Sequence, residues 1–215
     1  MSRRGFRARL LVPVLALVAL AGASCSNKPH EESPEDYIRK ITAGRAAKDA
    51  DFQAGHDVVP DARKAELLPL AYFPVDPAYN VLAGLKPATE DIVVEMPTST
   101  GVRRKMRQVG RMEFTLKGQQ MSLLAFNEVG APDNTHVTLM FSDMTSGTET
   151  YAAGRYIDLP LTASGIYSLD FNLAYFPYCY YNPTYECPYP PAENRLKVPI
   201  HAGERLKKAG DAAAK

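Results

Sequence analysis

The stretch Gly110-Arg111-Met112-Glu113-Phe114-Thr115-Leu116-Lys117 decides the fold class of this 215-residue chain. Apolar and polar residues alternate along it, so the side chains of an extended strand would point in turn to a core and to water. Lys117-Gly118 then supplies turn residues, and another apolar run follows from Gln119. The stretch therefore predicts two β-strands separated by a tight turn.

Short runs of the same kind recur on both sides of this stretch. Turn residues such as Ser99-Thr100-Gly101 and Thr145-Ser146-Gly147 separate several of them. Many short strands with tight connections predict a mainly β (α+β) fold, an antiparallel β sandwich or barrel with N-terminal helices packed on one face or end. Besides the opening stretch, we expect strands near Tyr79–Leu85, Asp91–Met96, Val102–Gln108, Gln119–Asn127, His136–Ser142, Arg155–Asp158, Ile166–Phe171 and Leu196–Ile200.

Two helices are predicted before the strands. Ser33-Pro34-Glu35-Asp36 is typical of a helix start, because serine caps free amides, proline fits the first turn and acids favour the positive end of the helix dipole. Apolar residues then recur at helical spacing, which predicts an amphipathic helix from Pro34 to Gln53. A second, short helix is expected after Asp61, ending before Pro69.

The first 24 residues have the layout of an export signal. Four arginines precede an apolar core from Leu10 to Leu20, which is shorter than the roughly 20 residues of a spanning helix. Ala21-Gly22-Ala23-Ser24-Cys25 resembles the cleavage box of bacterial lipoproteins, so we expect lipidation of Cys25 and a tether over residues 25–33. The alternative is ordinary signal cleavage, which would leave Cys25 as a thiol.

The export signal also bears on the route and the charge. Ser2-Arg3-Arg4-Gly5-Phe6 resembles the twin-arginine motif, an alternative to general secretion. Removing the signal changes the formal charge from +1 to −3, and no basic patch suited to nucleic acid remains. We therefore expect a cell-envelope protein, bound to the membrane through its lipid and facing the periplasm or outer surface. Residues 34–204 would form one globular domain and residues 205–215 a loose tail.

Tyrosine, proline and cysteine gather near the C-terminus. Six of the twelve tyrosines lie between Tyr175 and Tyr189, and the many prolines nearby lack amide donors, which predicts a structured loop instead of a central strand. In an exported protein, Cys179 and Cys187 are expected to form a disulfide worth roughly 2.5 kcal/mol. A metal site and a thiol nucleophile are the alternatives. Because the four histidines are scattered, we expect neither a metal nor another cofactor.

The strand that enters this loop supplies the candidate site. By alternation, Asp170 and Asn172 point to the same side, beneath the loop. An arginine there would fork onto a carboxylate or phosphate, which predicts a small polar or anionic ligand. In the structural alternative, Arg155 pairs with Asp170, while Glu193 and the asparagines hydrogen-bond the loop backbone. The predicted ligand-binding residues are Arg155, Asp170, Asn172, Tyr178, Asn182, Glu193 and Asn194.

Motifs in the same region carry a family resemblance. They are Asp170-Phe171-Asn172, Tyr175-Phe176-Pro177-Tyr178-Cys179, Cys187-Pro188-Tyr189-Pro190-Pro191 and Glu193-Asn194-Arg195-Leu196. In this order they closely resemble the signature of the bacterial domain-of-unknown-function family 1684. The resemblance extends upstream through Tyr72–Pro77 and Tyr151–Tyr156, to cover about residues 36–204, and it implies no established reaction.

The sequence favours binding over catalysis. It contains no Gly-rich phosphate loop, no His-Glu-x-x-His and no Gly-x-Ser-x-Gly, and no catalytic residue is assigned. The leading hypothesis is a binding or envelope-interaction module. The alternative is a small hydrolase-like enzyme with Asp170 or Glu193 as general base and Arg155 holding an anionic substrate. A purely structural lipoprotein is the third hypothesis. The run Asp143–Gly147 is interpreted only as a hairpin turn.

Overall fold

The structure is a computed structural model that describes residues 32–131, 135–208 and 210–211. These residues all belong to the compact unit that begins at Glu32. The predicted export signal, Cys25 and most of the predicted tether lie outside the described residues. Within the described ranges, no helix combines the length and apolar character needed to cross a membrane.

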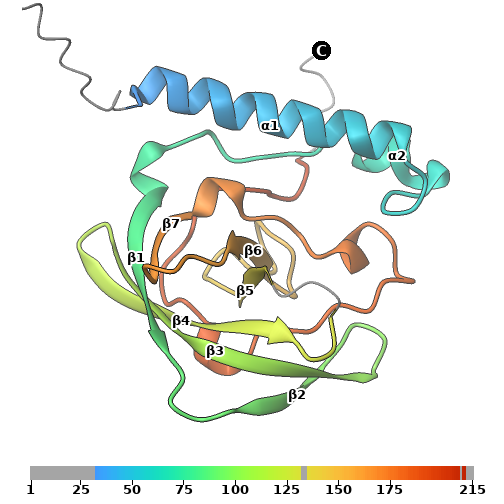
Figure 1. Cartoon of the computed structure of the whole chain (residues 1–215). Helices are drawn as coiled ribbons and strands as arrows, with labels where there is room; N and C mark the ends of the chain where they lie inside the picture. The colour runs from blue at the N-terminus through green and yellow to red at the C-terminus, as the bar shows by residue number, and fades with distance from the viewer. Residues whose placement is uncertain (1–31, 132–134, 209, 212–215) are drawn as a thin grey trace, which may run out of the picture. The chain divides into compact units, whose positions relative to one another are not determined.

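Seven strands of the described chain form one antiparallel sheet that curls into a nearly closed barrel (Figure 1). The order is β6-β5-β4-β3-β1-β7, and β2 pairs with β3 outside this path. The predicted mainly β, antiparallel fold is thus confirmed, in its barrel form. The strands are β1 (Asn80–Pro87), β2 (Val93–Pro97), β3 (Arg103–Leu116), β4 (Gln119–Glu128), β5 (His136–Phe141), β6 (Arg155–Pro160) and β7 (Ile166–Asp170).

The barrel has an open seam where its two end strands, β6 and β7, approach each other. These strands follow one another in the sequence but stand at opposite ends of the hydrogen-bonded order. Beside the seam, the backbone of Tyr156 exchanges hydrogen bonds of 2.9 and 3.0 Å with that of Tyr175, beyond the end of β7. The segment after β7 therefore continues the barrel wall at this point, while no strand pairing joins β6 to β7 among the described residues.

The opening stretch and the strand predicted near Val102–Gln108 form one long, bent strand, β3, instead of two shorter strands. β3 is 14 residues long and shifts its register against β4 between Gln108 and Gly110. A Cβ at Gly110 would lie 2.2 Å from the Lys86 carbonyl oxygen, closer than real Cβ contacts come. The bulge together with this glycine lets β3 bend so that it follows the barrel and also pairs with β2.

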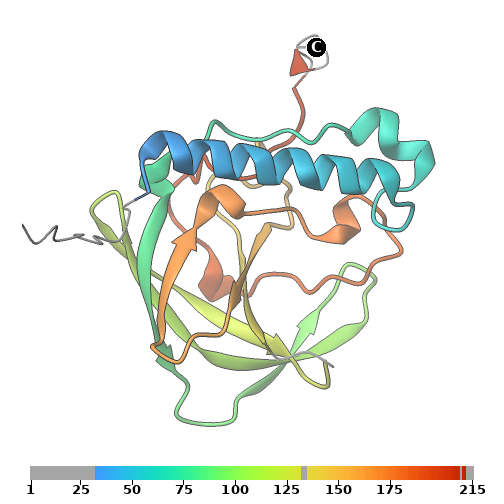
Figure 2. The same ribbon diagram turned by 45° about the horizontal axis from the view of Figure 1, so that its top comes forward.

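Helix α1 (Pro34–Ala54) lies across one end of the barrel in both ribbon views (Figure 1, Figure 2). The Ser33 hydroxyl caps it by accepting from the Asp36 amide at 3.1 Å. Its buried residues, Tyr37 and Ile41, recur at helical spacing and face the barrel. α2 (Asp61–Leu67) follows, so both predicted helices are confirmed.

The chain after β7 is irregular apart from short 3₁₀ turns, as predicted for the tyrosine-rich loop. The strand predicted at Leu196–Ile200 is wrong. The Leu196 amide donates to the Ser142 carbonyl and the Met144 amide to the Val198 carbonyl, but Pro199 has no amide to extend a ladder. The 3₁₀ turns of the described residues are η1 (Pro77–Tyr79), η2 (Phe171–Leu173), η3 (Tyr178–Tyr180) and η4 (Ala192–Asn194).

The start of the predicted tail is held in place. Arg205 forks onto the carboxylate of Asp211 at 2.6 and 2.7 Å, and its amide donates to the Ala71 carbonyl. Lys207 donates to two carbonyl oxygens at the end of α2. Residues 205–208 thus pack on the N-terminal part of the domain, where the sequence predicts a loose segment.

Candidate functional site

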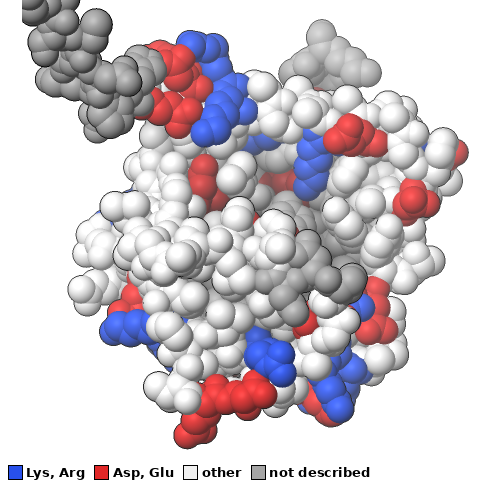
Figure 3. Space-filling view, in the orientation of Figure 1, with Lys and Arg blue, Asp and Glu red and all other residues white. Residues whose placement is uncertain are grey.

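A pocket of about 680 Å³ lies between α1 and the open seam of the barrel. Figure 3 shows acidic and basic side chains where the surface is hollowed beneath α1. The roof of the pocket is α1, its walls are β6 and β7, and its floor is the segment that follows β7. We call it the seam pocket and define it by Tyr37, Gly44, Lys48, Asp158, Asp170 and Glu204.

Regular helical spacing places the roof side chains. Tyr37, Ile41, Gly44, Arg45 and Lys48 all line the pocket and recur every three or four positions, so they form one stripe along α1. Among them, Gly44 adds no side chain, and a Cβ built there would meet no atom within 4 Å. The helix therefore leaves free space in the middle of its pocket-facing stripe.

A hydrogen-bonded trio joins the roof to the β7 wall. Tyr37 donates its hydroxyl to Asp170 at 2.7 Å and accepts from the Asn172 side-chain amide at 2.9 Å. Asp170 also accepts from the Asn172 backbone amide at 2.9 Å. Burial, with the hydrogen bond to Asp170 as the next cause, raises the pKa of Tyr37. Tyr37 therefore stays a neutral donor, and Asp170 is held in place by groups that carry no charge.

A buried ion pair closes the other end of the pocket. Lys48 Nζ lies 2.6 Å from the Glu204 carboxylate, which is almost fully buried. Glu204 also accepts from the Phe176 amide at 2.7 Å and from the Tyr181 hydroxyl. Lys48 lies 4.9 Å from the centre of the Tyr175 ring, within the range of a cation–π interaction. This set ties α1 to the loop after β7.

Arg45 and Tyr72 form the inner edge of the roof. The Arg45 guanidinium stacks 4.4 Å from the centre of the Tyr72 ring and donates to the carbonyls of Phe73 and Asn172. Two buried atoms here have no hydrogen-bond partner in the described structure, Arg45 Nε and the Tyr72 hydroxyl. Burial lowers the pKa of Arg45 and raises that of Tyr72. Unmet hydrogen-bonding capacity is thus concentrated beside the pocket.

Asp158 projects from β6, on the opposite wall of the seam from Asp170. It accepts from the Thr138 hydroxyl at 2.6 Å and from the Tyr175 hydroxyl. Burial, together with the nearby Asp158 charge, raises the pKa of Tyr175, so this donor also stays neutral. A carboxylate therefore stands on each wall of the seam.

The structure brings only two of the predicted ligand-binding residues into this pocket, Asp170 and Asn172. Glu193 is exposed in η4, and Tyr178 packs its ring against Tyr185. Asn182 donates to the Asp57 carbonyl at 2.8 Å. These three lie elsewhere on the tyrosine-rich loop, outside the lining of the seam pocket.

Asn194 joins two strands. It is fully buried, and its side chain exchanges hydrogen bonds of 2.7 and 2.9 Å with the backbone of Leu124 in β4. It also donates to the Met140 carbonyl in β5 at 2.8 Å. The side-chain amide thus satisfies backbone groups of β4 and β5 at a place where the two strands have parted, and not the loop backbone that the structural alternative named.

Arg155 is fully buried in the barrel and pairs with Asp143 at 2.8 Å. The proposed pairing of Arg155 with Asp170 is therefore wrong. Asp143, interpreted from the sequence only as part of a hairpin turn, is the buried counter-charge of Arg155. The guanidinium also donates to the carbonyls of Ile200, Ala202 and Glu204. Its donors thus hold the C-terminal segment inside the barrel.

Cys179 and Cys187 are free, buried thiols that lie side by side. The Cys179 amide donates to the Cys187 sulfur at 3.3 Å. A hydrogen bond from the Cys187 thiol lowers the pKa of Cys179 to about 6, while the same bond raises the pKa of Cys187. The pair is close without being joined, so the predicted disulfide stays a prediction.

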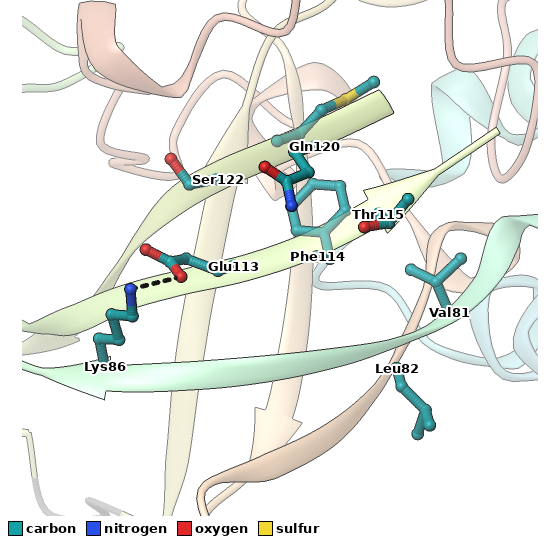
Figure 4. Close-up of a pocket in the computed structure, with 9 residues that line it drawn as sticks. Val81, Leu82, Lys86, Glu113, Phe114, Thr115, Gln120 and Ser122 are labelled. Carbon is teal, nitrogen blue, oxygen red and sulfur yellow. Dashed lines mark ion pairs between the residues drawn. The ribbon is translucent and has the colours of Figure 1, made fainter. Parts of the chain in front are cut away.

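An open groove of about 990 Å³ on the outer face of β1, β3 and β4 is larger but simpler (Figure 4). Its charged residues, Lys86 and Glu113, form an ion pair of 2.7 Å whose side chains are largely in solvent. Such an exposed pair is compensated by water and by its partner. The seam pocket, with buried polar groups and aromatic rings, is the better candidate site.

The comparisons with known proteins establish the family. The model of the family described as "Protein of unknown function (DUF1684)" matches residues 66–205, so the chain belongs to this family. An uncharacterized protein of the archaeon Haloarcula marismortui, solved by NMR, is 33% identical, with a TM-score of 0.63. The match covers 80% of this chain and 95% of that one. No curated protein matches. The predicted family is confirmed, with a match that begins at residue 66 instead of about 36.

Proposed function

We propose that the protein is an exported binding module of the cell envelope, lipid-anchored through Cys25, which takes a small polar ligand in the seam pocket. The observation that carries the proposal is the pocket itself, where a gap in the barrel wall meets a helix roof with aromatic and charged side chains. The hydrolase-like alternative is less favoured, because Asp170 is engaged by Tyr37 and Asn172 and Glu193 lies outside the pocket.

Gly44 supports a binding role because packing does not explain it. Glycine in a helix interior costs roughly 0.5–1 kcal/mol relative to alanine. Gly110, by contrast, meets a backbone oxygen where a Cβ would be, which explains its lack of a side chain. At Gly44 nothing stands within 4 Å, so the fold would accept a side chain there. Space kept open in the roof suits an occupant of the pocket.

The Gly44→Leu variant is expected to lose ligand while its free energy of unfolding stays the same or rises by about 1 kcal/mol, because leucine favours helix over glycine. The matched control is Ala46→Leu, an exposed position of the same helix that does not line the pocket. Native mass spectrometry of protein solubilised gently from its own membrane would measure the retained mass. Equal retention by the two leucine variants, or wild-type protein without any bound mass, would contradict the proposed site.

We further propose that Cys179 and Cys187 form a disulfide in the oxidising envelope. A disulfide oxidant such as oxidised glutathione is attacked by the Cys179 thiolate and releases one glutathione. The Cys187 thiol then loses its proton and attacks the Cys179 sulfur, which releases the second glutathione. The mature protein should therefore lack two hydrogens compared with its reduced form.

The rate at which reduced Cys179 is consumed is expected to be nearly constant above about pH 7 and to fall at lower pH, since the pKa of Cys179 is about 6 and only the thiolate attacks. The rate can be measured on reduced protein by quenched mass spectrometry, with Cys187→Ser as the control that stops at the mixed disulfide. A rate that keeps rising up to about pH 9, as for an ordinary thiol, would rule out the activated thiolate.

A further inference from the structure

The charges that line the seam pocket are unequally compensated. Lys48 pairs with Glu204 at 2.6 Å, and Lys40 pairs with Glu32 at 3.4 Å. Arg45 donates its fork to two backbone carbonyls. The two lysines of the pocket therefore already have carboxylate partners, whereas Arg45 has only neutral acceptors and its Nε has no hydrogen-bond partner in the described structure.

The other two carboxylates of the pocket accept only from neutral donors. Asp158 accepts from two hydroxyl groups, those of Thr138 and Tyr175. Asp170 accepts from the Tyr37 hydroxyl and from the amides of Asn172. No ion pair joins either carboxylate to a Lys or Arg within the part of the chain that the structure describes. Neutral donors orient a carboxylate without pairing its charge, so Asp170 has only the Coulombic attraction of the more distant Arg45, and Asp158 has only water and its hydroxyl donors.

The two carboxylates also stand in a suitable place. Asp158 is on β6 and Asp170 on β7, so they approach the pocket from opposite walls of the seam. Leu173 lines the pocket and is 54% exposed, an apolar side chain that an occupant would cover. Negative charge on both walls, beside apolar surface, matches a cation that carries a hydrocarbon body.

We propose, on the basis of the binding function above, that the ligand of the seam pocket is a small organic amine whose ammonium group lies between Asp158 and Asp170. Its three donors match the free lone pairs of the two carboxylates, and its apolar body packs against Leu173. This class differs from the anionic ligand that the sequence predicts. The difference arises because Arg155, the residue predicted to bind the anion, donates its hydrogen bonds to Asp143 and Ile200 inside the barrel.

A matched series of probes separates charge from shape. Binding of n-hexylamine, hexan-1-ol and hexanoate to the full mature protein can be measured by calorimetry at low salt. The amine should bind about tenfold tighter than the alcohol, because both probes can donate hydrogen bonds to the carboxylates but only the ammonium adds the attraction between opposite charges. Asp158→Asn should weaken binding of the amine more than binding of the alcohol, and so reduce this preference. Asp158 is exposed, so its substitution should leave the fold intact, and Glu113→Gln in the outer groove is the control.

The outcomes separate this inference from the proposed function. If hexanoate binds tightest, or the alcohol as well as the amine, and Gly44→Leu abolishes binding, the pocket binds ligand but the amine class is wrong. If no probe binds, the molecule that the native protein retains is identified by mass spectrometry. A retained molecule with a basic nitrogen supports the inference, and one without a basic nitrogen overturns it. Absence of both probe binding and retained mass overturns the proposed function and this inference with it.

Discussion

Replacing Arg155 by methionine is expected to lower the free energy of unfolding by about 3–5 kcal/mol, the cost of breaking a buried ion pair by removing one partner. Arg155 and Asp143 are both almost completely buried, so the carboxylate would lose its counter-charge without gaining water. The carbonyls of Ile200 and Ala202 would also lose their donor. Denaturant unfolding followed by circular dichroism measures the change.

Two further variants keep this expectation falsifiable. Adding Asp143→Asn to Arg155→Met removes the stranded charge while the side-chain oxygen can still accept from Thr145, so it should recover part of the loss. Arg107→Met breaks an exposed pair with Asp91 and should cost at most about 1 kcal/mol. Equal, small losses for Arg155→Met and Arg107→Met would mean that the buried pair does not hold the barrel together.

The second large effect is expected at Lys48, where methionine should cost about 3 kcal/mol, at the low end for a broken buried pair because Lys48 itself is partly exposed. Glu204 would keep its donors from Phe176 and Tyr181 but would lose its counter-charge inside the loop. Because this pair ties α1 to the loop, we expect α1 to detach first. Hydrogen exchange of the α1 amides would detect such a local opening.

The matched control is Lys40→Met, which makes the same change in the same helix. Lys40 pairs with Glu32 where both side chains are well exposed, so its loss should cost less than about 1 kcal/mol. If the two methionine variants unfold alike and exchange α1 amides alike, the Lys48–Glu204 pair does not anchor the helix.

The candidate site was predicted only in part. Alternation along β7 indicated that Asp170 would sit beside Asn172, and the structure joins them through Tyr37. The roof was missed, although a helical stripe from Tyr37 to Lys48 with a glycine inside it could have pointed to it. Glu204 was missed too, because its partner Lys48 is 156 positions away in the chain. No local pattern indicates which distant charge a carboxylate will meet.

By itself, the sequence determined the family, the two helices, most strands and the irregular loop after β7. These features depend on short-range physics, since a period of two or 3.6 residues, a cap or a proline acts within a few positions. Only the tertiary structure decided that the sheet closes as a barrel with an open seam, that Leu196–Ile200 stays irregular and that Arg155 meets Asp143. The reason is that closure and charge pairing depend on which distant segments pack together, and packing is a property of the whole chain.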